Sequence, residues 1–307
     1  VGGVGAVNQV LSLFQVVSNI ITAGTGILCA QYIGAAKSME EKQPLILGSL
    51  LINTVLGLLF SLAAVFGGDL LLTMVNIDEQ LRPYAREYLS IVGGFLFLQM
   101  LAMTFFVVIR SHGKTRSTMI FSLIMNLINV VLNYVLIFGH FGAPALGVVG
   151  AAVATAVSQV VGGVIPLIYF ARPNCSLLRL GRPLFDIKAL LRACTNGSSE
   201  LVSHISMSLV GMLYNVQLLR LAGENGVAAY GVLMYVNFIF VSAFIGYSTG
   251  IAPVVSYHFG AKNRNELHNL YKKSLIVILS LSLSMFLLSE ALATALSAVF
   301  VAYDAEL

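Results

Sequence analysis

The chain has 307 residues, of which 58% are apolar and only 10% are charged, and its mean hydropathy is +0.91. Soluble globular domains carry roughly 25% charged residues, so this composition excludes a soluble enzyme, a nucleic-acid-binding module and a disordered chain. It predicts an all-α polytopic membrane protein, because a helix satisfies its own backbone hydrogen bonds in lipid.

Eight apolar stretches are long enough to cross a bilayer, which requires roughly 20 residues in a helix. Glycine, proline or charged residues separate each stretch from the next. In chain order the predicted spans are Ala6–Ile33, Leu45–Phe66, Tyr88–Ile109, Met119–Phe138, Leu146–Phe170, Thr195–Leu221, Gly226–Tyr257 and Leu270–Phe300. We therefore expect eight transmembrane helices.

Basic residues are divided unevenly between the two sets of loops that these spans define. Of the 17 Lys and Arg residues, all but Arg82, Arg86 and Arg220 lie on one side. Cytoplasmic loops carry the excess of Lys and Arg, so the side rich in basic residues is predicted to be cytoplasmic. The first span then runs from the outside to the inside.

The chain contains an internal repeat with an offset of 226 residues, because residues 1–62 align with 227–288 without a gap. Matched pairs include Gly24 with Gly250, Gly34 with Gly260, Ala35 with Ala261 and Glu40 with Glu266. The copies are an even number of spans apart and have one orientation, as in transporters whose halves are related by an axis along the membrane normal. Completing both copies gives twelve spans, so we expect this chain to be a fragment that contains eight of them.

The repeat also predicts how the chain divides into lobes. Residues 1–172 would hold five of the six helices of an N-terminal lobe, and residues 195–307 would hold three of the six helices of a C-terminal lobe. The stretch between them, residues 173–194, is rich in basic residues and is expected to be a cytoplasmic linker.

One face of the sixth predicted span is polar. Glu200 lies four residues before His204, so the two side chains share a helix face. The same face continues through Asn196, Ser208, Gly211 and Asn215. In a bilayer it must point to a water-filled cavity or to polar partners. A desolvated carboxyl group beside an imidazole can bind H⁺, Na⁺ or the amine of a cationic substrate, whereas a packed polar contact would only fix the helix position.

Three further spans carry polar residues. Gln15 and Asn19 lie in the first span and are predicted to line the same cavity. Asn129 and Asn133 are four residues apart on one face of the fourth span, and Thr155 follows a run of small residues in the fifth. Interhelical hydrogen bonds and close helix packing are alternatives to a role in the cavity.

Several motifs, taken together and in this order, cover essentially the whole chain and resemble the multidrug and toxin extrusion (MATE) family, most closely its bacterial members. The motifs are Ala30-Gln31-Tyr32-Ile33-Gly34-Ala35, Arg110-Ser111-His112-Gly113-Lys114-Thr115-Arg116, Asn129-Val130-Val131-Leu132-Asn133-Tyr134, Gly147-Val148-Val149-Gly150-Ala151-Ala152-Val153-Ala154-Thr155, Asn196-Gly197-Ser198-Ser199-Glu200 and Gly226-Val227-Ala228-Ala229-Tyr230-Gly231.

The resemblance implies a twelve-helix fold in two lobes, of which this chain would hold helices two to nine. It implies a secondary active antiporter, not an enzyme, that exports cationic or lipophilic compounds in exchange for Na⁺ or H⁺. The expected partners are a small-molecule substrate and the lipid bilayer, with no cofactor beyond the coupling ion. A monomer in the inner (plasma) membrane of the cell is expected.

The resemblance also assigns roles to residues. Glu200 looks like the family's acidic residue in a cation site of the C-terminal lobe, and His204, its neighbour on the same helix face, completes the predicted cation-coupling site. The polar faces themselves, and not the resemblance, predict that the substrate cavity is lined by Asn196, Ser208, Asn215, Gln15 and Asn19. The residues Asn129, Asn133 and Thr155 look like the family's N-lobe cation site, although many members carry Asp where this chain has Asn133.

Two other functions are alternatives. A flippase for lipid-linked saccharides has a related architecture, but it would be expected to carry Arg or Lys within its spans to bind pyrophosphate, and none of the 17 basic residues is placed in mid-span. An intramembrane enzyme would need a constellation such as His-Glu-x-x-His or paired aspartates, which Glu200 and His204 alone do not supply.

Overall fold

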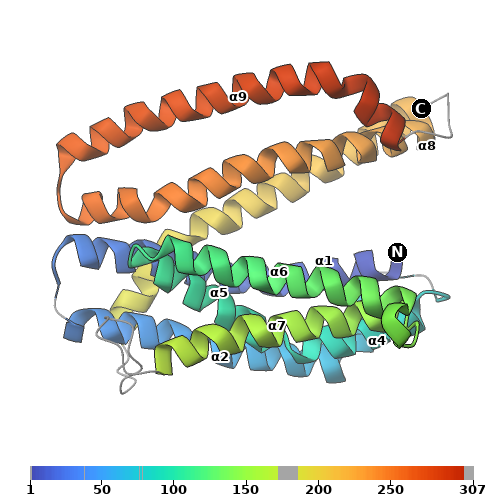
Figure 1. Cartoon of the computed structure of the whole chain (residues 1–307), viewed down its shortest axis with the longest axis horizontal. Helices are drawn as coiled ribbons and strands as arrows, with labels where there is room; N and C mark the ends of the chain where they lie inside the picture. Colours follow the sequence, from blue (N-terminus) through green and yellow to red (C-terminus); the bar gives the residue numbers. More distant parts are fainter. Residues whose placement is uncertain (1, 38, 76, 78, 172–185, 301–307) are drawn as a thin grey trace. The chain divides into compact units, whose positions relative to one another are not determined.

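A computed structural model describes residues 2–37, 39–75, 77, 79–171 and 186–300, and all the regular structure among them is helical (Figure 1). The elements are α1 (Gly2–Gly34), α2 (Met39–Phe66), α3 (Gly68–Met74), α4 (Arg82–Gly94), α5 (Leu96–Ser111), α6 (Thr115–Phe138), the 3₁₀ turn η1 (His140–Gly142), α7 (Val148–Ala171), α8 (Ile187–Gly260) and α9 (Arg264–Phe300). Within these ranges, seven helices are long and apolar enough to span a membrane, or eight if the bent pair α4 and α5 forms one span. The predicted all-α polytopic class is confirmed.

The chain divides into two compact units, Val1–Leu201 and Val202–Leu307. The first unit includes the beginning of α8, because Ala189 and Ala193 are buried in one apolar cluster with Leu28 and Leu45. The described end of the predicted linker therefore packs with the first unit. Residues 173–185 of that linker lie outside the described part of the chain.

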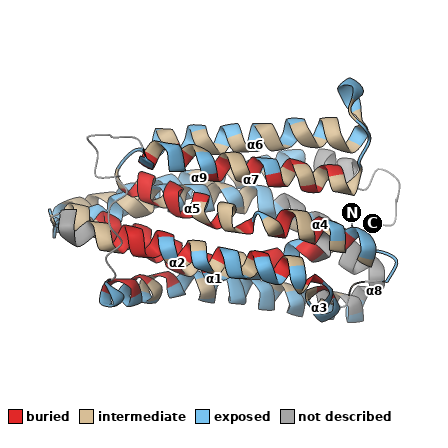
Figure 2. Ribbon diagram, turned by 90° about the horizontal axis from the view of Figure 1, so that it is seen from below, coloured by how far each residue is buried: buried red, intermediate tan, exposed pale blue. Residues whose placement is uncertain are grey.

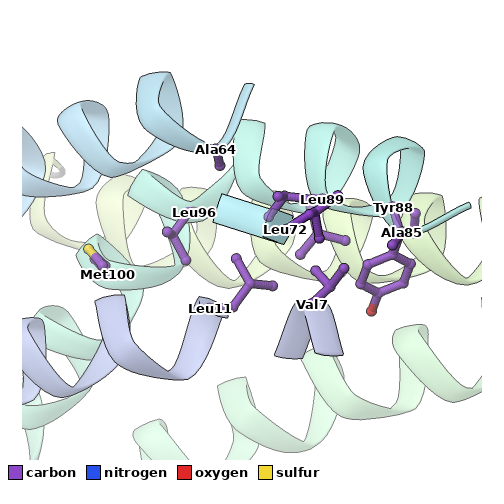
Figure 3. Packing of buried hydrophobic residues seen from close by; sticks show 11 residues of the cluster. Val7, Leu11, Ala64, Leu72, Ala85, Tyr88, Leu89, Leu96 and Met100 are labelled. Atoms are coloured by element: carbon purple, nitrogen blue, oxygen red, sulfur yellow. The ribbon is translucent and has the colours of Figure 1, made fainter. Parts of the chain in front are cut away.

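The apolar core of the first unit lies mainly between α1, α2, α4, α5 and α7 (Figure 2). Val7 and Leu11 of α1 meet Leu72, Leu89 and Leu96 from α3, α4 and α5 (Figure 3). By contrast, α6 has a largely exposed or half-buried surface and contacts α7 more than any other helix. A long apolar helix that packs along one side only is suited to face lipid with the other.

The third predicted span is not one straight helix, and the expectation of a continuous span at Tyr88–Ile109 is corrected. α4 and α5 are bent by 46° at Phe95, directly after Gly93 and Gly94, because glycine is a poor helix former. The backbone N–H of Phe97, released by the break, donates to Ser61 Oγ of α2 at 3.2 Å. This hydrogen bond stabilises the break at the place where α2 packs against α5.

α1 and the beginning of α8 touch backbone to backbone. A Cβ atom on Gly24 would overlap the carbonyl oxygen of Ala193, and one on Gly197 would overlap the carbonyl oxygen of Ile20. Ala193 of α8 lies against Gly24, and Gly197, four residues later, lies against Ile20, four residues earlier in α1. The two helices therefore run antiparallel here. Small residues allow this close approach.

α8 continues through residues 222–225, which separate the sixth and seventh predicted spans, but the chain reverses direction between Tyr214 and Tyr230. The rings of Tyr214 and Tyr230 stack with their centroids 5.4 Å apart. A straight α-helix would separate residues sixteen positions apart by about 24 Å. α8 therefore holds two candidate spans, Ile187–Leu218 and Asn237–Gly260, and Figure 1 shows its ribbon turning back.

The two copies of the predicted repeat have the same hydrogen bonds at the ends of their first helices. Ala36 and Lys262, which are 226 positions apart, both have a left-handed backbone, with φ of 52° and 55°. Their N–H groups donate to the carbonyl oxygens of Ile33 and Phe259 at 3.0 and 3.1 Å. The next N–H group in each copy bonds the carbonyl oxygen five residues earlier, at 3.0 Å. Both helices thus end in the same Schellman motif.

Candidate functional site

The first unit contains a pocket of about 210 Å³ between α1, α4, α5 and α7. It is lined by Asn8, Leu11, Ser12, Gln15, Tyr88, Val92, Gln99, Thr155 and Gln159. The lining includes amides, hydroxyls and one aromatic ring, but no Asp, Glu, Lys, Arg or His. Such a surface can hydrogen-bond a ligand, but it supplies no formal charge.

Two amides meet across the pocket wall. Gln159 Nε2 of α7 donates to Gln99 Oε1 of α5 at 2.8 Å. Gln99 lies in the first turn after the break at Phe95, and its N–H donates to Phe95 O at 3.4 Å. The break thus places Gln99 opposite α7. Gln159 is only 5% exposed.

A ladder of polar side chains joins α6 to α7 beside this pocket. Asn133 Nδ2 donates to Asn129 Oδ1 at 3.0 Å, and Asn129 Nδ2 donates to Ser158 Oγ at 3.3 Å. The hydroxyls of Ser158 and Thr155 in turn donate to backbone carbonyls of α7. Thr155 also lines the pocket. The ladder is uncharged, so it can fix α6 on α7 but cannot neutralise a bound cation.

The structure brings together part of the predicted site. Gln15 and Thr155 line the pocket, and Asn129 and Asn133 form the adjoining ladder. Asn19 is half-buried on α1 and is not among the lining residues. Gln99 and Gln159 were not predicted from the sequence. Gln159 lies one helical turn after Thr155, and this spacing could have pointed to it.

A second polar cluster of the first unit is buried and closed. Asn53 Oδ1 accepts from Ser18 Oγ at 2.9 Å, and Asn53 Nδ2 donates to Thr104 Oγ1 at 3.1 Å and to Thr22 Oγ1 at 3.3 Å. All four residues are at most 3% exposed. Because both polar atoms of the amide are satisfied internally, this cluster holds α1, α2 and α5 together and is not a binding site.

The polar face of the sixth predicted span begins at the crossing of α1 with α8. Asn196 is half-buried, whereas Glu200, His204 and Ser208 are exposed. The side chain of Asn215 lies outside the described residues. Within the described part of the chain, no three His, Cys, Asp or Glu side chains could hold a metal ion together. Glu200 lies one turn beyond the buried Gly197, near the middle of the candidate span Ile187–Leu218.

Comparisons with known proteins agree over most of the chain. The family described as MatE matches residues 1–135 and 201–307. The probable multidrug resistance protein NorM of Thermotoga maritima is 28% identical over 94% of this chain and 63% of the relative. The multidrug export protein MepA of Staphylococcus haemolyticus is 27% identical over 91% of this chain and 60% of the relative. The chain therefore spans less than two thirds of the length of these relatives.

Solved structures share the fold. One described as the outward-facing conformation of a multidrug resistance MATE family transporter of the MOP superfamily matches with a TM-score of 0.89 at 21% identity, over 97% of this chain and 66% of that chain. A second, of a MOP superfamily transporter from Pyrococcus furiosus, also has a TM-score of 0.89, at 20% identity over 99% of this chain and 67% of that chain.

Proposed function

This chain belongs to the MATE family, and we propose that the whole protein is a secondary antiporter that exports cationic or lipophilic compounds in exchange for Na⁺ or H⁺. The family is one of transporters, which agrees with the apolar composition and the helical spans. The names of the Thermotoga and Staphylococcus relatives support drug export.

The observation that carries this proposal is the uncharged pocket of the first unit. Its amide and hydroxyl groups offer hydrogen bonds in a site of about 210 Å³ that Tyr88 also lines. The absence of any formal charge from the lining means that binding there does not demand one particular charge pattern. This property suits an exporter of chemically diverse compounds.

We assign cation coupling to Glu200, with His204 one turn further along α8 as its partner. The pocket and the ladder beside it lack a carboxylate. The negative charge that neutralises the coupling ion is therefore expected in another part of the protein. Glu200 lies near the middle of a candidate span, where an ionisable group is costly unless it is used. A carboxyl group there can bind H⁺ or Na⁺ in one state and release it in the other.

The mechanism that we propose is alternating access. Rocking of the two lobes would expose the substrate and cation sites to one side of the membrane at a time. Cation binding at Glu200 would favour the state that releases the substrate, since a ligand shifts a conformational equilibrium only through its different affinity for the two states. The related flippase function is less well supported, because the pocket lining has no Lys or Arg for a pyrophosphate.

The experiment is gradient-driven transport by the whole protein in proteoliposomes, with Na⁺ and pH gradients imposed separately. We expect one of the two gradients to drive uphill transport of a fluorescent cation. Glu200→Gln should abolish that transport at normal protein levels. The matched control is Glu290→Gln, because Glu290 is also exposed but lies near the end of its candidate span. Unchanged transport by Glu200→Gln would refute the assignment.

A further inference from the structure

A second pocket of the first unit lies between α3 and α4 and has no part in the proposed transport cycle. It has a volume of about 380 Å³ and is lined by Asp69, Glu79, Arg82, Pro83 and Arg86. One water molecule occupies about 30 Å³ of the liquid, so this pocket can hold a molecule much larger than a single ion. Its two carboxylates and two guanidinium groups balance in formal charge.

Protein contacts fix most of this charged lining. Arg86 Nη2 donates to the carbonyl oxygen of Val65, at the end of α2, at 2.7 Å, and Arg86 Nε pairs with Asp69 Oδ2 at 3.4 Å. Arg82 Nη2 donates to Thr73 Oγ1 at 2.9 Å and to the carbonyl oxygen of Asp69 at 3.2 Å. These bonds hold α3 against α4 before any ligand binds, which lowers the ordering cost of recognition.

Two charged groups of the pocket keep free bonding capacity. Both hydrogen bonds of Arg82 use Nη2, so its Nε and Nη1 donors have no partner within the described part of the chain. The side chain of Glu79 is exposed and makes no ion pair with the residues that the structure describes. A guanidinium group suits a phosphate, and a carboxylate accepts hydrogen bonds from an ammonium group. The pocket therefore fits a ligand that carries both.

The position of the pocket indicates where such a ligand would come from. The candidate span of α2 ends at Phe66, three residues before Asp69, so the pocket lies at the level where lipid headgroups meet water. Phe66, Leu70 and Met74 are 79%, 69% and 75% exposed. Leu70 and Met74 lie one turn apart on α3, and each directly follows a residue of the polar side, Asp69 or Thr73. An apolar stripe thus borders the charged pocket, as acyl chains beneath a headgroup require.

We propose that this pocket binds the headgroup of phosphatidylethanolamine, with the phosphate on Arg82 and the ammonium group on Glu79, while the acyl chains lie along the exposed apolar stripe of α3. The ammonium group of this lipid has three N–H donors. Phosphatidylcholine carries the same charges, but its trimethylammonium group has no N–H. Phosphatidylglycerol has a phosphate but no cation that could pair with Glu79.

Native mass spectrometry of the purified whole protein tests the inference, with the three lipids added separately and with identical acyl chains. The wild-type protein should bind phosphatidylethanolamine about fivefold more tightly than either other lipid, which is the effect of one well-formed exposed ion pair. Equal affinities for phosphatidylethanolamine and phosphatidylcholine would overturn the proposal, and so would tightest binding of phosphatidylglycerol.

The variant Glu79→Gln keeps the size of the side chain and removes its charge. It should reduce the preference for phosphatidylethanolamine over phosphatidylcholine to less than about twofold and leave the affinity for phosphatidylcholine nearly unchanged. The matched control is Glu87→Gln, because Glu87 is also exposed on this side of the chain but does not line the pocket. If Glu79→Gln keeps the preference, or Glu87→Gln removes it equally, the lipid is selected elsewhere and the proposal fails.

The lipid assay needs neither an ion gradient nor a drug. Its outcome is therefore independent of the antiport proposal, and either of the two proposals can fail while the other stands.

Discussion

The two copies of the internal repeat have the same local structure but different surroundings. Both first helices end in the same Schellman motif, at Ala36 and at Lys262. Yet half of the residues in the most apolar stretch of Val7–Gly34 are buried, whereas no residue in the most apolar stretch of Asn237–Gly260 is buried. Hydrogen bonding within a helix end therefore follows from local sequence, while burial depends on which partners a helix meets.

The largest expected effect comes from the glycines that the repeat matches. Gly24→Ala should destabilise the first unit by about 3 kcal/mol, because its Cβ would overlap the carbonyl oxygen of Ala193 and force α1 away from α8. Gly250→Ala should be neutral or stabilising by up to about 1 kcal/mol, since no atom lies within 4 Å of the new Cβ and alanine favours helix. Thermal unfolding in detergent measures both.

Equal loss of stability in these two variants would contradict the comparison, because it would mean that Gly250 meets a close partner as Gly24 does. Normal stability of Gly24→Ala would instead show that α1 and α8 do not cross at this position.

A smaller effect is expected from the buried polar cluster, which is present in only one copy. The positions that match Asn53 and Ser18 are Leu279 and Phe244, so the second copy cannot form this cluster. Asn53→Leu should lower the unfolding free energy by about 1–3 kcal/mol, because it removes the acceptor of the buried Ser18 hydroxyl and the donor to Thr22 and Thr104. The control is Asn126→Leu on the exposed face of α6, which should change stability little in the same unfolding measurement. Equal effects of the two variants would contradict a structural role for the cluster.

The smallest expected effect comes from glycine substitutions at the two left-handed positions, and it tests whether the two loops are equivalent. Ala36→Gly and Lys262→Gly should each stabilise by about 0.5–1 kcal/mol, because glycine adopts a left-handed backbone without a steric penalty. Ala35→Gly, at a position with negative φ, should destabilise instead. Chemical unfolding in mixed micelles can resolve these shifts. Opposite signs for Ala36→Gly and Lys262→Gly would show that the two loops are not equivalent.

Much of the fold could be predicted because it follows from patterns within single segments. Apolar length gave the eight spans, and the pairs at Gly34 and Ala35 gave the repeat. The bend at Phe95 was missed, although Gly93 and Gly94 were a visible signal. Its position also depends on Ser61, which lies in another helix and could not be connected to Phe97 from sequence alone.

The candidate site was predictable only in part, for the same reason. Polar residues in apolar spans pointed to Gln15 and Thr155, which do line the pocket. The pairing of Gln99 with Gln159 joins residues sixty positions apart, and no periodicity indicates such a contact. The role of Glu200 stays a prediction, since it concerns a change of charge during transport and not a packed contact.

The central claim is that the substrate binds in an uncharged pocket while Glu200 carries the coupling ion. The most direct test adds substrate to the solubilised whole protein in weak buffer and measures displaced cation, as acidification for H⁺ or as loss of bound ²²Na⁺. We predict that the wild-type protein releases cation, and that Glu200→Gln binds substrate with unchanged affinity but releases none. Equal release of cation by the wild-type protein and Glu200→Gln would contradict the account.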